Sequence, residues 1–161
     1  LFHKQAKRMN NKAKLLKVYV YIDGGARGNP GQAGAGIVIH DADDNAVIFK
    51  GGYFLGETTN NVAEYQALLK ALQLADKFGA QMVEIKSDSE LLVRQMNGEY
   101  RVRNANLKTL FDQARDLMKR FKKCTFSHIP REENKTADKL VNQAINLKSN
   151  VEDAEGSEEY V

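Results

Sequence analysis

The sequence has almost no cysteine and no tryptophan, and it lacks long apolar runs. Cys124 is the one cysteine among 161 residues, which excludes an internal disulfide framework and a zinc site built from cysteines. No apolar run approaches the roughly 20 residues that a membrane span needs. The first 17 residues carry six Lys or Arg, which is not the pattern of a signal peptide. We therefore expect an intracellular, cytoplasmic protein that has no membrane partner.

Charge is present but unevenly distributed along the chain. The net charge is only +3, yet residues 1–17 contain basic and no acidic side chains, and residues 151–161 contain acidic and no basic ones. We predict a basic N-terminal extension at 1–16 that is flexible or a linker, one folded domain at 17–148, and an acidic disordered tail at 149–161. The basic segment would attract nucleic-acid phosphates, or it is a solvated tail; the sequence leaves both readings open.

Hydrophobic periodicity predicts a mixed α/β domain. Alternating β-rich segments predict three antiparallel strands, with a bulge at Gly51–Gly52 in the third and a turn made by the glycine-rich stretch after the first. Helical spacing and two further β-rich segments follow. The predicted strands are 17–22, 35–40, 46–55, 82–87 and 124–129, and the predicted helices are 60–78, 89–97, 107–121 and 137–145. This order predicts a five-stranded mixed sheet flanked by helices.

Four acidic residues stand at the ends of these predicted elements. Asp23 and Asp88 end the first and fourth strands, while Glu64 and Asp138 lie in the first turns of two helices. Neighbouring strand ends would bring the two aspartates together, and clustered carboxylates repel one another and raise each other's pKa. Hard divalent cations relieve this repulsion and prefer oxygen ligands. We therefore predict a site for two Mg²⁺ ions, with Mn²⁺ as a possible substitute.

Four motifs surround these acids. They are YIDGGARGNPGQAGAGIVI at 21–39, TTNNVAEYQALLKAL at 58–72, IKSDSELLVRQMNG at 85–98 and REENKTADKL at 131–140. In this order and spacing they resemble the ribonuclease H type 1 family over about residues 17–147. The resemblance implies a monomer with a ribonuclease H-like fold, which cuts the RNA strand of RNA–DNA hybrids without sequence preference. It also implies 5′-phosphate and 3′-hydroxyl products, and catalysis by Asp23, Glu64, Asp88 and Asp138 as the metal ligands.

The resemblance extends to residues that would bind the substrate. Gly24 leaves room for a nucleic-acid backbone. Asn29 fits a substrate contact and also an ordinary turn, and both can hold together. Asn60 and Asn61 are expected to read the minor groove of the hybrid, although a place near the N-cap of the helix also explains them. Two further positions, Thr59 and Asn104, resemble the family's pocket for a phosphate of the DNA strand. An N-cap role explains Asn104 equally well.

The sequence departs from the family pattern in two places. The basic, tryptophan-rich insertion of longer members is absent, so substrate binding must rely on other residues. The histidine of the mobile loop is also missing, because His128 falls in a predicted strand. We expect Arg131 to be the more plausible cationic substitute, with slower turnover or a preference for Mn²⁺. Whether the compact site tolerates double-stranded RNA stays open.

Two alternatives remain at this point. The chain is either a stand-alone nuclease or the nuclease domain of a reverse transcriptase or another multidomain protein. It could also be a binding module without catalysis, although all four acids are present. Cleavage assays on RNA–DNA, RNA–RNA and DNA–DNA duplexes separate the enzyme from the binding module.

Overall fold

The computed structural model describes residues 15–154. The predicted basic extension, except for Leu15 and Leu16, and residues 155–161 of the predicted tail lie outside this range. Among the described residues, no helix is both long enough and apolar enough to cross a membrane.

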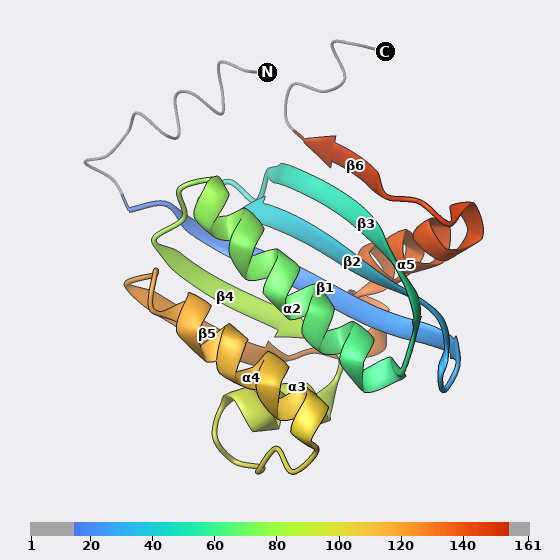
Figure 1. Cartoon of the computed structure of the whole chain (residues 1–161). Coiled ribbons are helices and arrows are strands. Elements are labelled where there is room, and N and C mark those ends of the chain that lie inside the picture. Colours follow the sequence, from blue (N-terminus) through green and yellow to red (C-terminus); the bar gives the residue numbers. More distant parts are fainter. Residues whose placement is uncertain (1–14, 155–161) are drawn as a thin grey trace.

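A six-stranded mixed sheet in the order β5-β4-β1-β2-β3-β6 forms the centre of the domain (Figure 1). The first three strands are antiparallel neighbours, β4 and β5 run parallel to β1, and β6 is antiparallel to β3. The strands are β1 (Lys17–Gly28), β2 (Gly31–Asp41), β3 (Val47–Thr58), β4 (Met82–Ser87), β5 (Lys123–His128) and β6 (Val151–Ala154). The helices are α2 (Asn60–Lys77), α3 (Glu90–Met96), α4 (Ala105–Met118) and α5 (Lys135–Leu147). The mixed α/β fold class and the antiparallel arrangement of the first three strands are confirmed.

The sixth strand corrects the prediction of five strands and of disorder from residue 149. Val151–Ala154 pairs with β3, and the Tyr53 hydroxyl donates a hydrogen bond to Glu152 Oε2 over 2.6 Å. The Asn150 side chain also accepts a hydrogen bond from the backbone of Phe54. The acidic side chains of this segment give no apolar pattern, because its pairing depends on backbone groups and on a partner about 100 residues earlier.

The hairpin between β1 and β2 corrects a second prediction. The sequence pattern predicts a turn in the glycine-rich stretch and an end of the first strand at Asp23, but β1 continues to Gly28 and pairs with β2 throughout. Asp23 therefore lies within a strand. Gly51 and Gly52 pair regularly with β2, and the register shifts lie at Ala33/Gly34 and Ile39/His40, so the predicted bulge is wrong. Glycine is a turn signal in a sequence, whereas Gly24, Gly34, Gly36 and Gly52 lie where helices contact the sheet.

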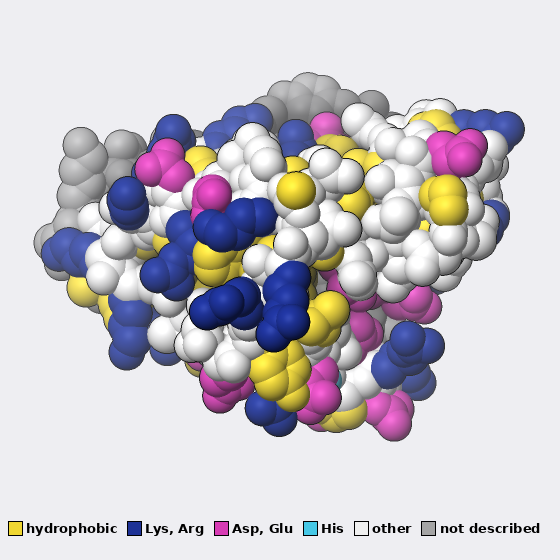
Figure 2. Space-filling view, turned by 60° about the horizontal axis from the view of Figure 1, so that its bottom comes forward, with side chains coloured by type: hydrophobic (Ala, Val, Ile, Leu, Met, Phe, Trp, Pro, Cys, Tyr) yellow, Lys and Arg dark blue, Asp and Glu magenta, His cyan; other side chains and the backbone are white. Residues whose placement is uncertain are grey.

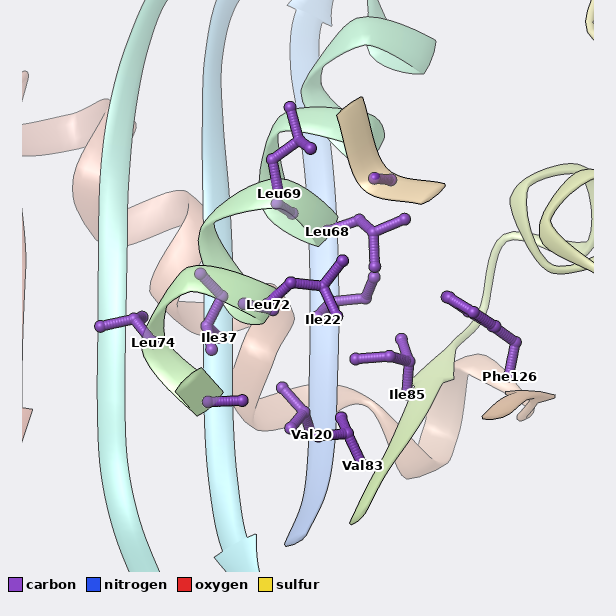
Figure 3. Packing of buried hydrophobic residues seen from close by; sticks show 14 of the residues in the cluster. Val20, Ile22, Ile37, Leu68, Leu69, Leu72, Leu74, Val83, Ile85 and Phe126 are labelled. Carbon is purple, nitrogen blue, oxygen red and sulfur yellow. The ribbon is translucent and has the colours of Figure 1, made fainter. Parts of the chain in front are cut away.

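The main core lies between one face of the sheet and α2. Alternate residues of β1 are buried on this face, where Val20 and Ile22 lie near Leu68 and Leu72 of α2 (Figure 3). The other residues of β1, including Asp23, point to the opposite face. There α5 covers part of the sheet and packs through Ala137 and Leu140.

Both helices approach the sheet at glycines. A Cβ atom at Gly24 would come closer than 3.0 Å to the backbone of Ala63 in α2. Cβ atoms at Gly36 and Gly52 would clash in the same way with the carbonyl oxygens of Ala137 and Leu140 in α5. These positions bring the helix backbones into direct contact with the strands.

We expect Gly36→Ala to lower the free energy of unfolding by about 1–3 kcal/mol, because the new methyl group would have to displace the backbone of α5. Gly25→Ala is the matched control, since the nearest atoms to its Cβ lie 3.7 and 3.9 Å away. The control should change stability by less than about 0.5 kcal/mol. Chemical denaturation measures both, and equal effects would contradict the close contact at Gly36.

Candidate active site

The four predicted acids line one pocket of about 190 Å³. Asp23 lies within β1, and Asp88 directly follows β4; because Ile22 and Ser87 are paired in the parallel ladder, the two aspartates are neighbours. Glu64 comes from the start of α2, and Asp138 lies in the first turn of α5. Residues far apart in the sequence therefore meet beyond the end of β4.

The carboxylates are close enough to perturb one another. Burial, then the charges of Asp88 and Asp138, raise the pKa of Asp23 from 3.8 to about 8, and a hydrogen bond with Asp138 adds to this. Burial raises the pKa of Glu64 from 4.5 to about 7, which the hydrogen bond with Ser89 and the positive charge of Arg131 partly oppose. The cluster therefore carries less than its full negative charge near pH 7.

This set of donors suits a hard cation. Four carboxylates around one pocket supply only oxygen ligands, and a divalent ion would relieve the repulsion that raises their pKa values. Within residues 15–154, however, no three His, Cys, Asp or Glu side chains stand close enough to form a ready-made metal site. A cation would have to draw the side chains together.

Asn134 belongs to the site, although no role for it is predicted from the sequence. Its side chain is 1% exposed, and its Nδ2 donates to the Ile22 carbonyl over 2.8 Å and to Asp88 Oδ2 over 3.4 Å. It therefore links α5 to β1 and orients one of the four acids. The available signal was its position in the Asn-x-x-x-Asp motif, four residues before Asp138.

Two of the asparagines predicted to bind substrate, Asn29 and Asn60, hold the hairpin between β1 and β2. Asn29 Oδ1 accepts a hydrogen bond from the backbone N–H of Asn60, and Asn60 Oδ1 accepts one from the backbone of Ala26, each over 3.1 Å. Asn60 lines the pocket, whereas Asn61 is exposed. Gly24 also lines the pocket, but α2 occupies the space that its missing side chain leaves.

The two residues predicted to bind a DNA phosphate cap helices. The Thr59 hydroxyl accepts a hydrogen bond from Val62 N over 3.3 Å, so Thr59 is the N-cap of α2, and the asparagine pair follows it. Asn104 Oδ1 accepts hydrogen bonds from the backbone of Asn106 and Leu107. The N-cap interpretation of Asn104 is thus confirmed, and neither residue is among those that line the pocket.

The two candidate auxiliary residues differ in position. His128 is the exposed last residue of β5, as its predicted strand requires, and it does not line the pocket. Arg131 does line the pocket. Arg27 also lines the pocket; no role for it is predicted from the sequence, because it lies in the stretch predicted to be a turn. Arg27 Nη2 donates to Asn142 Oδ1 over 3.2 Å.

In comparisons with known proteins, this chain is similar to several ribonucleases H. A family model described as reverse transcriptase-like matches residues 21–144. A bifunctional protein of Mycobacterium tuberculosis is 41% identical over 81% of this chain and 36% of its own length. The solved ribonuclease H1 of Halobacterium salinarum is 38% identical with a TM-score of 0.79, covering 81% of this chain and 98% of that one.

A further solved structure contains nucleic acid. LC11 ribonuclease H1 in complex with an RNA/DNA hybrid is 47% identical with a TM-score of 0.77, covering 81% of this chain and 98% of that one. Against the mycobacterial relatives, the chain spans only about a third of their length.

The raised pKa of Asp23 predicts a pH-dependent stability in metal-free buffer. The folded protein retains a proton that the unfolded chain releases near pH 3.8. The stability contributed by this group is therefore complete below that pH and is lost as the pH rises to about 8. Asp23→Asn removes the titration, so we expect the variant to unfold at a higher temperature than the wild type at pH 8, and the difference to shrink at pH 5.

Thermal unfolding in EDTA measures this difference, and a gain of 1 kcal/mol corresponds to roughly 2–4 °C. Parallel pH dependence in the wild type and the variant would show that the pKa of Asp23 is not raised.

Proposed function

Because the chain belongs to the ribonuclease H type 1 family, we propose that it is an endoribonuclease that cuts the RNA strand of RNA–DNA hybrids without sequence preference. The observation that carries the proposal is the convergence of Asp23, Glu64, Asp88 and Asp138 on one pocket. The similarity to a ribonuclease H1 that was solved with an RNA/DNA hybrid supports the choice of substrate.

The four carboxylates would hold two Mg²⁺ ions, with Mn²⁺ as a substitute. When bound, these ions supply a nucleophilic water at neutral pH and stabilise the charge that develops on the phosphodiester oxygens. The chain's own residues position the ligands: Asn134 orients Asp88, and Arg131 favours the ionised form of Glu64. The products would carry 5′-phosphate and 3′-hydroxyl ends.

The serines beside Asp88 have structural roles, which supports direct attack by water. Ser87 is 3% exposed, and its hydroxyl accepts a hydrogen bond from Ser89 N over 3.0 Å. The Ser89 hydroxyl caps α3 by accepting a hydrogen bond from Leu92 N. Neither side chain is placed to act as a free nucleophile.

Beyond the pocket, the substrate would contact Asn61 at the start of α2 and basic side chains near α3 and α4. The Asn61 side chain is exposed and forms no hydrogen bond within residues 15–154, so it is the member of the asparagine pair that is most available to the minor groove. Lys and Arg side chains gather on the lower face of the molecule, where α3 and α4 lie (Figure 2). Arg101 and Arg103 are exposed beside Asn104, and we propose that they meet phosphates of the DNA strand.

The domain would act as a monomer, either alone or as part of a longer protein. Because the compact site lacks the insertion of longer relatives, double-stranded RNA is a second duplex to test as a substrate.

Incubation with Mg²⁺ and labelled duplexes tests the proposed function. We expect the wild type to cut the RNA strand of an RNA–DNA hybrid and to leave DNA–DNA intact. Asp88→Asn should reduce the rate by at least about 100-fold, because a metal ligand and the partner of Asn134 are both altered. Gel electrophoresis of the products reports the cleavage and the ends. Binding of the hybrid by the wild type without cleavage of any duplex would instead indicate a non-catalytic binding module.

A second experiment compares the two candidate auxiliary residues. We expect Arg131→Ala to lower the single-turnover rate about ten-fold, because Arg131 lines the pocket and its charge acts on Glu64. His128→Ala should change the rate less than about two-fold, since His128 does not line the pocket. The opposite ranking would assign proton handling to His128, and no change in either variant would exclude both.

A further inference from the structure

Arg27 occupies an unusual electrostatic position. Its side chain is exposed and lines the same pocket as four carboxylates. A guanidinium beside such a cluster would ordinarily form an ion pair. Within the part of the chain that the structure describes, Arg27 forms none, and its recorded partner is the neutral amide of Asn142.

Asn142 is itself fixed. Its Nδ2 donates to the Asp138 carbonyl one turn earlier in α5, over 3.1 Å, while its Oδ1 accepts from Arg27. Both ends of the amide are therefore engaged. A guanidinium has five N–H donors, so a single bond to Asn142 directs the group and leaves most of its donors and its full charge for a ligand.

The backbone that carries Arg27 is also held. The Asn60 side chain binds Ala26, the residue before Arg27, and Asn29 binds the backbone of Asn60. The hairpin is thus tied to α2 on one side and to α5 on the other. A cation that is fixed in this way loses little conformational freedom when an anion binds.

We propose that Arg27, positioned by Asn142, binds a phosphate of the RNA strand adjacent to the phosphate that is cut. This inference rests on the proposed function, since it assumes a hybrid in the carboxylate pocket. The pocket's acids repel a bare phosphate and require cations, whereas Arg27 supplies a permanent positive charge at the rim of the same pocket. Charge-assisted bonds of this kind match the fork of donors that arginine presents to phosphate oxygens. Arg27 thereby takes over part of the binding that the absent basic insertion would provide.

Binding of a fluorescent RNA–DNA hybrid, measured by anisotropy in an Asp88→Asn background, tests this inference without cleavage. We expect Arg27→Ala to weaken binding about ten-fold or more and to reduce the slope of log Kd against log salt by about one phosphate contact. Arg27→Lys should retain the salt slope but bind less tightly than the wild type, because lysine lacks the fork. Asn142→Ala should weaken binding less, and it should have no further effect once Arg27 is replaced.

Arg120→Ala is the matched control. Arg120 pairs with Asp76 over 2.8 Å, just before the start of β5. Since β5 runs parallel to β4 and the pocket lies beyond the far end of β4, replacement of Arg120 should leave hybrid binding unchanged. Equal losses in Arg27→Ala and Arg120→Ala would reduce the effect to net charge and overturn the proposal, as would an unchanged salt slope in Arg27→Ala. In the Asp88-intact proteins, Arg27→Ala should raise KM much more than it lowers kcat. A wild type that binds the hybrid but cuts no duplex would overturn the proposed function and still leave the binding result for Arg27 interpretable.

Discussion

Direct contact between helix backbones and strand glycines is the constraint on which the site depends. In α2, Ala63 rests on Gly24, and the next residue is Glu64. In α5, Ala137 rests on Gly36, and the next residue is Asp138. Asp23 precedes Gly24 in the chain and is paired with Gly36 across the ladder. The close contact of Ala63 with Gly24 therefore places Glu64 near Asp23, and the contact of Ala137 with Gly36 places Asp138 there. A side chain at either glycine would prevent the corresponding contact.

This arrangement works against the electrostatics of the fold. Burial and mutual repulsion raise the pKa values of Asp23 and Glu64, so the ionised cluster costs stability that packing elsewhere must supply. The large core between α2 and the sheet provides that stability. Asn134 adds a local link, because its buried amide joins Asp88 to the backbone of β1 through one side chain. A bound cation would relieve the repulsion between these carboxylates and so stabilise the fold.

The elements that were predicted correctly are those whose apolar residues recur at a regular spacing within the element. Strand β4 was predicted at its observed bounds and α2 within one residue, because periodic apolar residues report which face is buried. The extent of β1 and β2 was not predicted, because glycine weakens the strand pattern. The helix residues that these glycines contact are distant in the sequence: Ala63 of α2 for Gly24 in β1, and Ala137 of α5 for Gly36 in β2. The presence of β6 was missed for a similar reason. For the site, local motifs identified the four acids, but the roles of Asn134 and Arg27 depend on partners 112 and 115 residues distant.

The polar residues that line the pocket, and those that cap the neighbouring elements, divide by charge into two groups. Several neutral side chains, namely Asn29, Asn60, Thr59, Asn104, Ser87 and Ser89, accept hydrogen bonds from backbone N–H groups and so shape the hairpin and the helix starts. The charged side chains do not cap backbone N–H groups in this way. The four acids line one pocket, and Arg27 forms no ion pair with any described residue. Neutral groups can satisfy the backbone without altering the field in the pocket, so the charges stay available. The four acids suit metal ions, and Arg27, which has no ion-pair partner among the described residues, suits a phosphate. The pocket therefore matches a nucleic acid that binds together with metal ions, although the chain lacks the basic insertion of longer relatives.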